Sequence, residues 1–92
     1  MGAKVIIKMK VMPESPETNL TNVQDQIKQI LNKYDAKGEQ FQIEPIAFGL
    51  HAIIINFLID EDNGSTDPIE QDISNIEDVR GVEITGVSRA LG

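Results

Sequence analysis

The segment from Leu50 to Asp60 constrains the fold more than any other, because nearly all of its side chains are apolar. Such a run is typical of a strand in the middle of a sheet, with covered surface on both sides. Alternate side chains of a strand point to opposite faces, and the set with more large apolar side chains should face the core. This set consists of Ile53, Ile55, Phe57 and Ile59. The other phase is less polar than an exposed sheet face normally is. This indicates either a tightly packed central strand or a sheet face that is partly covered.

Three further segments alternate with the two-residue period of a half-buried strand. The first covers residues 4–12, the second centres on residues 40–44, and the last covers residues 82–87. The residues expected to face inward are Val5, Ile7, Met9 and Val11 in the first segment, Phe41 and Ile43 in the second, and Val82 and Ile84 in the last. On the opposite face of the first segment we expect Ile6, Lys8 and Lys10.

Two segments repeat at the spacing of an amphipathic helix. Residues 20–34 form the first, with Thr18 or Asn19 placed to cap its start and Gly38 marking its exit. The second follows a predicted turn at residues 60–64. The residues that indicate its start are Ser65, Thr66 or Asp67 as the cap and Pro68 at the first position, with Glu70 placed to reach back if Asp67 is the cap. The two apolar stripes are Leu20, Val23, Ile27, Ile30, Leu31 and Tyr34, and then Ile69, Ile73 and Ile76.

The predicted order is therefore strand, helix, strand, strand, helix, strand. Each helix has one apolar face and can cover only one side of a sheet. Right-handed crossovers then favour a ferredoxin-like β-α-β-β-α-β fold, an α+β domain with a four-stranded antiparallel sheet and both helices on one face. We expect residues 1–92 to form this single domain. The fold alone does not choose a function, because many unrelated activities share it.

Charge and composition narrow the choice of partners. The chain carries a formal charge of −7 and no cysteine. A phosphate backbone would be repelled on average, so nucleic acid is not an expected direct partner. No segment reaches the length of a membrane span, and the first residues do not form a signal peptide, so we expect a cytoplasmic protein.

The sequence also shows no pattern of residues that is typical of a catalytic site for covalent chemistry. His51 is the only imidazole, and no cysteine, phosphate-binding glycine loop or metal-ligand spacing accompanies it. We therefore expect neither a cofactor nor an enzyme, and we assign His51 a structural or partner-facing role. An RNA-recognition domain would have this topology and Lys8 and Lys10 on its open face, but its central strands would need stacking aromatics there. Phe57, the only aromatic in these strands, falls in the core phase.

The loop between the second and third strands carries Phe48 between a proline and a glycine. Pro45 fixes its own φ and disfavours helix at the preceding residue, and Gly49 permits backbone angles that a side chain would forbid. Such a loop can hold a phenyl ring rigidly as an anchor for another protein. The alternative is that Phe48 turns back into the core, as phenylalanine commonly does.

Three segments of the chain resemble the beta subunit of archaeal translation elongation factor one. They are Glu44-Pro-Ile-Ala-Phe-Gly-Leu50 with the apolar strand after it, Lys10-Val-Met-Pro-Glu-Ser-Pro16, and Gly81-Val-Glu-Ile-Thr-Gly-Val-Ser-Arg89. The similarity extends over essentially the whole chain. It implies a guanine-nucleotide exchange factor for elongation factor one alpha, the GTPase that delivers aminoacyl-tRNA.

The resemblance also implies which residues contact this GTPase. In eukaryotic relatives the aromatic residue of the matching loop inserts into the partner, so the implied contact residues are Pro45, Ala47, Phe48, Gly49 and His51. A lysine near the C-terminus of those relatives disturbs the partner's magnesium site, but the last residues here contain no lysine. Arg89 is the cationic residue nearest to the C-terminus and is included as a contact residue on that basis.

The alternative function is that of a ferredoxin-like regulatory domain that binds a small molecule on its sheet face or at a dimer interface. The Phe48 loop discriminates between the two functions. An exposed ring favours the exchange factor, whereas a buried ring with a closed pocket elsewhere favours the regulatory domain.

Overall fold

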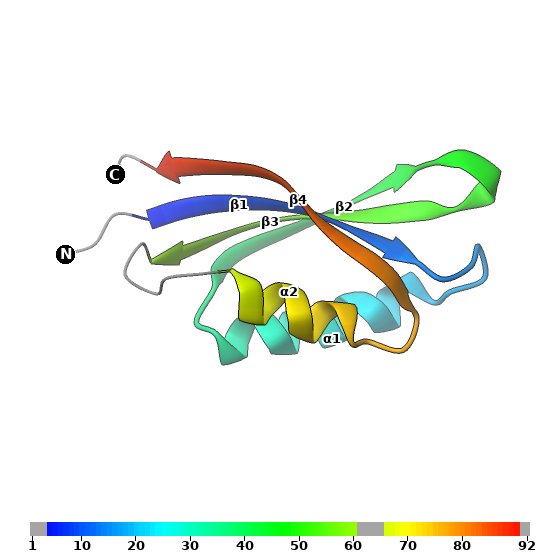
Figure 1. Ribbon diagram of the computed structural model, residues 1–92, viewed down its shortest axis with the longest axis horizontal. Helices are drawn as coiled ribbons and strands as arrows, with labels where there is room; N and C mark the ends of the chain where they lie inside the picture. Colours follow the sequence, from blue (N-terminus) through cyan, green and yellow to red (C-terminus); the bar gives the residue numbers. More distant parts are fainter. Residues whose placement is uncertain (1–3, 61–65, 91–92) are drawn as a thin grey trace.

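The computed structural model describes residues 4–60 and 66–90, and the elements follow the predicted order (Figure 1). The strands are β1 (Lys4–Pro13), β2 (Lys37–Pro45), β3 (His51–Asp60) and β4 (Val79–Ala90). The helices are α1 (Leu20–Lys33), α2 (Asp67–Ser74) and the single turn η1 (Ala47–Gly49). Most of the predicted turn at residues 60–64, and the candidate cap Ser65, lie outside the described residues.

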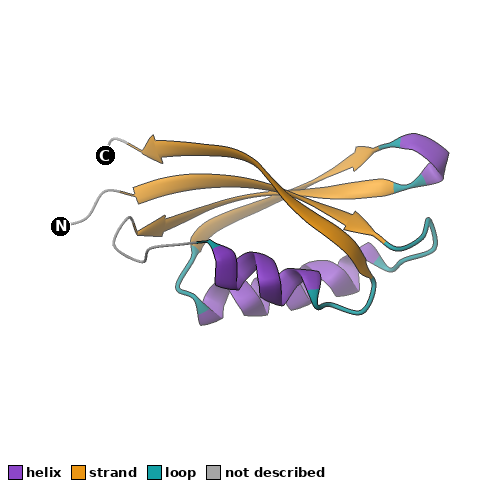
Figure 2. Ribbon diagram, in the orientation of Figure 1, coloured by secondary structure: helices purple, strands orange, loops and turns teal. Residues whose placement is uncertain are grey.

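The four strands form one antiparallel sheet in the order β2-β3-β1-β4, so β3 and β1 occupy its centre. Figure 2 shows α1 and α2 together on one face of this sheet, with the other face open. The ferredoxin-like fold is therefore confirmed. The central position of β3 also explains its apolar sequence, because even its residues on the open face, Ala52 and Ile54, are buried.

The core lies between the sheet and the two helices. Its fully buried large side chains are Ile7, Met9, Val11, Val23, Ile27, Leu31, Ile53, Ile55, Phe57 and Ile73. The inward phases predicted for β1, β3 and both helices thus agree with the packing. No charged or polar residue is buried among the residues that the structure describes, so the domain is held mainly by apolar contact.

The first helix begins as predicted but ends earlier. Asn19 is the cap, and its side-chain oxygen accepts a hydrogen bond of 3.1 Å from the backbone N–H of Asn22. Gly38 does not form the exit. Instead Asp35 adopts a left-handed φ of 62°, which lets the N–H of Ala36 donate to the carbonyl of Leu31. Aspartate tolerates this conformation better than most residues, so no glycine is needed there.

The second helix has Thr66 as its cap, with Asp67 and Pro68 already in the first turn. The alternative that Asp67 is the cap is therefore wrong. Glu70 reaches back to Thr66 instead, whose hydroxyl lies 3.3 Å from a Glu70 carboxylate oxygen. At the other end of α2 the hydroxyl of Ser74 donates to the carbonyl of Gln71.

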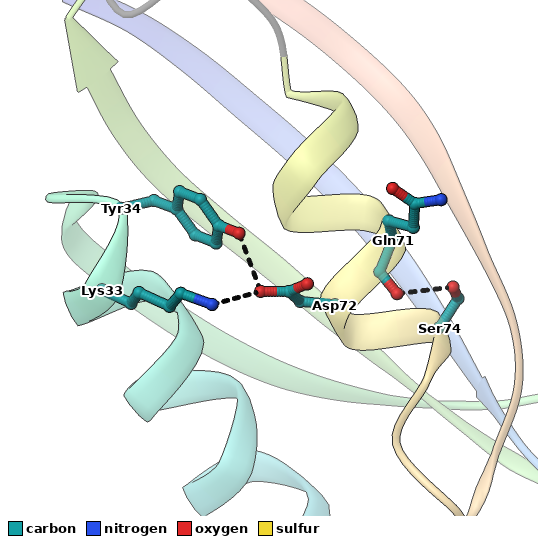
Figure 3. Close-up of polar contacts among 5 residues, drawn as sticks. All are labelled: Lys33, Tyr34, Gln71, Asp72 and Ser74. Carbon is teal, nitrogen blue, oxygen red and sulfur yellow. Dashed lines mark hydrogen bonds and ion pairs between the residues drawn. The ribbon is translucent and has the colours of Figure 1, made fainter.

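A polar cluster joins the two helices at the surface (Figure 3). Asp72 on α2 accepts a hydrogen bond of 2.8 Å from the hydroxyl of Tyr34 and one of 3.2 Å from the Lys33 ammonium. The Tyr34 hydrogen bond, followed by the one from Lys33, holds the pKa of Asp72 below its usual value. The hydrogen bond to Asp72 and the charge of its carboxylate raise the pKa of Lys33.

Two strands, β2 and β4, each differ from the prediction in one respect. Ile43 pairs with Ile53 in the inward phase but is 45% exposed, because it lies on the edge strand β2, whereas Ile53 on the central strand β3 is buried. The last strand is longer than predicted and starts at Val79, which is buried, so Gly81 lies within it. Val82 and Ile84 pack against the core as expected.

Candidate partner-binding site

The site is the tip of the β2–β3 hairpin. Pro45 pairs with His51 as the last rung between the strands, and the chain then turns through η1. The turn is closed by hydrogen bonds from the N–H of Ile46 to the carbonyl of Leu50 (2.8 Å) and from the N–H of Leu50 to the carbonyl of Ala47 (3.2 Å). These bonds fix the loop independently of any core contact, since none of the three residues of η1 is buried.

Phe48 points out of the protein from this tip. The residue is 92% exposed, the largest value among the large hydrophobic residues that the structure describes. The alternative that the ring turns back into the core is therefore wrong. An aromatic ring held in water gains nothing for folding, which makes an intermolecular role the more natural explanation.

The backbone at Phe48 is also unusual, with φ 61° and ψ 30°. Gly49 follows with a φ of 74°. The left-handed region suits glycine, but for a bulky residue such as Phe48 it is rarely adopted and costs free energy. Strain of this kind is concentrated at functional sites, where the surrounding structure holds the residue in place.

The loop between β1 and α1 flanks the tip. A Cβ atom added to Gly49 would lie 3.9 Å from the Cβ of Pro16. This loop is itself anchored, because the N–H of Glu14 donates to the carbonyl of Asp78 at 2.8 Å. The tip therefore stands beside a second ordered segment.

The predicted site residues form two separate groups. Pro45, Ala47, Phe48, Gly49 and His51 are all exposed and lie together at the tip. Arg89, also exposed, pairs across the sheet with Val5 on β1, at the opposite end of the strands. The strand register puts roughly 25 Å between the two ends, so Arg89 and Phe48 cannot act on the same atom.

The open sheet face carries a groove that the sequence analysis did not identify. It crosses from β4 over β1 and β3 to β2 and has a volume of about 440 Å³. Its lining residues are Lys8, Lys10, Gln42, Ile43, Glu44, Pro45, Ile54 and Thr85. The signal for it was the low polarity of the second phase of β3. The groove itself depends on which side chains the register brings together.

Within residues 4–60 and 66–90, no three His, Cys, Asp or Glu side chains gather where they could hold a metal ion. No helix in these ranges is long and apolar enough to cross a membrane. What the tip can do is place a rigid aromatic ring into a pocket of another molecule.

Comparison with known proteins identifies the family. Residues 6–90 match the family model of the EF-1 guanine nucleotide exchange domain. Elongation factor 1-beta of Methanocaldococcus jannaschii is 41% identical over 96% of this chain and 99% of its own length. Elongation factor 1-beta of Methanococcus aeolicus is 38% identical over 91% of this chain and 94% of its own length.

Among solved structures, the chain resembles LarC2, the C-terminal domain of a cyclometallase involved in the synthesis of the NPN cofactor of lactate racemase. The TM-score is 0.66 at 12% identity, with 97% of this chain and 58% of that chain covered. This likeness concerns the fold alone.

Proposed function

The chain belongs to the EF-1 guanine nucleotide exchange domain family, and we propose from this premise that it promotes release of GDP from translation elongation factor one alpha. A role as exchange factor in translation elongation follows from the family and from relatives that match over nearly their whole length. The observation that supports the more specific proposal is the exposure of Phe48 on its strained, hydrogen-bonded tip.

Exchange needs no bond chemistry. The factor binds the nucleotide-free GTPase better than the loaded one, and by linkage factor and nucleotide then weaken each other's binding by the same ratio. Speeding release about ten-thousandfold lowers its barrier by roughly 5.5 kcal/mol. Burial of the Phe48 ring in a pocket of the GTPase contributes about 2 kcal/mol of this, and neighbouring contacts supply the remainder.

Each contact residue has a part in this proposal. Phe48 is the anchor, and Pro45 and Gly49 hold the loop in the conformation that presents it. Ala47 and His51 lie on either side and contact the rim of the pocket. Arg89 touches a separate region of the GTPase, because it stands at the far end of the sheet.

The test is release of labelled GDP from elongation factor one alpha with and without this protein. We expect the native protein to accelerate release and Phe48→Ala to lose roughly thirtyfold of that acceleration, the loss typical of an aromatic anchor worth about 2 kcal/mol. Gln29→Ala is the control, because Gln29 is also exposed but lies on α1 and not in either of the two proposed contact regions.

The outcomes separate two claims. If neither the native protein nor any variant changes the release rate, the proposed exchange function is wrong. If Phe48→Ala accelerates release as well as the native protein does, exchange stands and the role of Phe48 is refuted.

A further inference from the structure

The groove on the open sheet face has an apolar floor. Ile54 on β3 lies in it and is only 8% exposed, and the neighbouring Ala52 is completely buried. Lys10 on β1 and Glu44 on β2 approach to 3.7 Å across β3 and cover part of this floor. A face of this kind differs from the hydrated outer face of an ordinary antiparallel sheet.

Lys8 is the cation that remains available in the groove. It is exposed, and it makes no ion pair with any residue that the structure describes, whereas Lys10 is paired with Glu44. Its partner in β4 is Gly86, which presents no side chain. A Cβ placed on Gly86 would lie 3.5 Å from the Cβ of Lys8. The groove therefore offers an uncovered positive charge in a chain whose formal charge is −7.

The groove is continuous with the tip, because Pro45 belongs to both. Continuity matters for the size of the interface. A stable complex between two proteins buries about 800 Å² on each partner, and one aromatic side chain supplies at most about 250 Å² of this. The Phe48 ring alone is too small, so the interface must extend onto a surface next to the tip.

We propose that the groove is this extension and that it receives an extended, carboxylate-bearing segment of the same GTPase. A carboxylate of the segment pairs with Lys8, and the segment lies across β1 and β3 over the side chains that line the groove. The inference rests on the proposed function, since it takes the GTPase as the occupant. It assigns the open sheet face a role in affinity, whereas the tip acts on nucleotide release.

The experiment measures the dissociation constant between nucleotide-free elongation factor one alpha and four forms of the full chain, at low and high salt. These forms are the native protein, Lys8→Arg, Lys8→Glu and the control Lys28→Glu. Lys28 is an exposed lysine on α1, on the helical side of the sheet, so its replacement changes the net charge equally. We expect Lys8→Glu to bind roughly tenfold more weakly at low salt, with a smaller difference at high salt. Lys8→Arg and Lys28→Glu should bind within about twofold of the native protein.

The results distinguish this inference from the function on which it rests. If Lys8→Glu binds as the native protein does, or if Lys28→Glu weakens binding equally, the groove is not part of the interface and the inference is overturned. If the native protein binds the GTPase but does not accelerate GDP release, the exchange function is wrong, and the effect of Lys8→Glu on binding still decides the role of the groove. If the native protein does not bind the GTPase at all, both proposals are refuted.

Discussion

Replacement of Phe48 by glycine should lower the exchange activity by about thirtyfold, as loss of the ring does in Phe48→Ala, and leave the stability of the domain nearly unchanged. This combination is unusual, because removal of a large apolar side chain normally destabilises a small domain by several kcal/mol. The expectation follows from the two properties of Phe48 that the structure combines, an exposed ring and a positive φ.

The magnitude follows from three contributions. The covered part of the side chain, less than a tenth of it, is about 20 Å² of apolar surface, worth about 0.5 kcal/mol. Relief of the left-handed conformation contributes about 1–2 kcal/mol in favour of the variant. The larger backbone entropy of glycine in the unfolded chain costs about 0.4–1 kcal/mol. The free energy of unfolding should therefore change by between about −0.5 and +1 kcal/mol.

The assay is urea unfolding of the native protein, Phe48→Gly and Phe48→Ala, together with GDP release for each. Both variants lack the ring, but only alanine keeps the strained backbone, so Phe48→Gly should be the more stable variant by about 1 kcal/mol. If the glycine variant loses more than about 2 kcal/mol relative to the native protein, the ring packs against the domain and the reasoning fails. If the alanine variant is the more stable one, the argument from backbone strain is refuted.

Three further predictions concern the scaffold. Asn19→Ala should lower the free energy of unfolding by about 1 kcal/mol in urea titrations, since it removes the cap of α1. Ile27→Ala, at a fully buried position, should cost about 2–5 kcal/mol and lower the midpoint of thermal unfolding accordingly. The surface cluster should contribute stability above the usual carboxyl pKa and lose it as pH falls through the lowered pKa of Asp72, because the folded state binds that proton less readily. Acid titration of Tyr34→Phe, which lacks the first cause of that lowered pKa, should show a weaker loss in this window.

The element order and most of the core could be predicted because the buried residues recur in the sequence at the regular spacing of a helix or a strand. Ile27 and Leu31 recur at helical spacing, and Ile53 and Ile55 alternate, so each set identifies one face of its element. Ile43 broke this rule. Its phase was correct, but it is exposed on the edge strand β2, and no local pattern shows which strand of a sheet lies at the edge.

The candidate site could be located from sequence but not described. Pro45 and Gly49 indicate a rigid loop. However, Phe48 also adopts a left-handed backbone, and phenylalanine does so too rarely for this to be predicted from its residue type. The groove was out of reach for a different reason. Lys10 and Glu44 meet across β3 although they come from strands that are not neighbours in the sheet. Contacts of that kind depend on the register of three strands at once.

The separation between core and tip explains why this domain can carry a strained, exposed aromatic residue at all. The fully buried side chains lie between the sheet and the helices, whereas the hairpin passes beyond them and is closed by its own backbone hydrogen bonds. We therefore expect substitutions at Phe48 to act on binding with little effect on folding, and substitutions in the core to act on folding first. A small domain without disulfides has little stability to spare, and this chain of 92 residues contains no cysteine. Strain is tolerable in it only where few other contacts depend on the strained residue, and the end of a projecting hairpin is such a place.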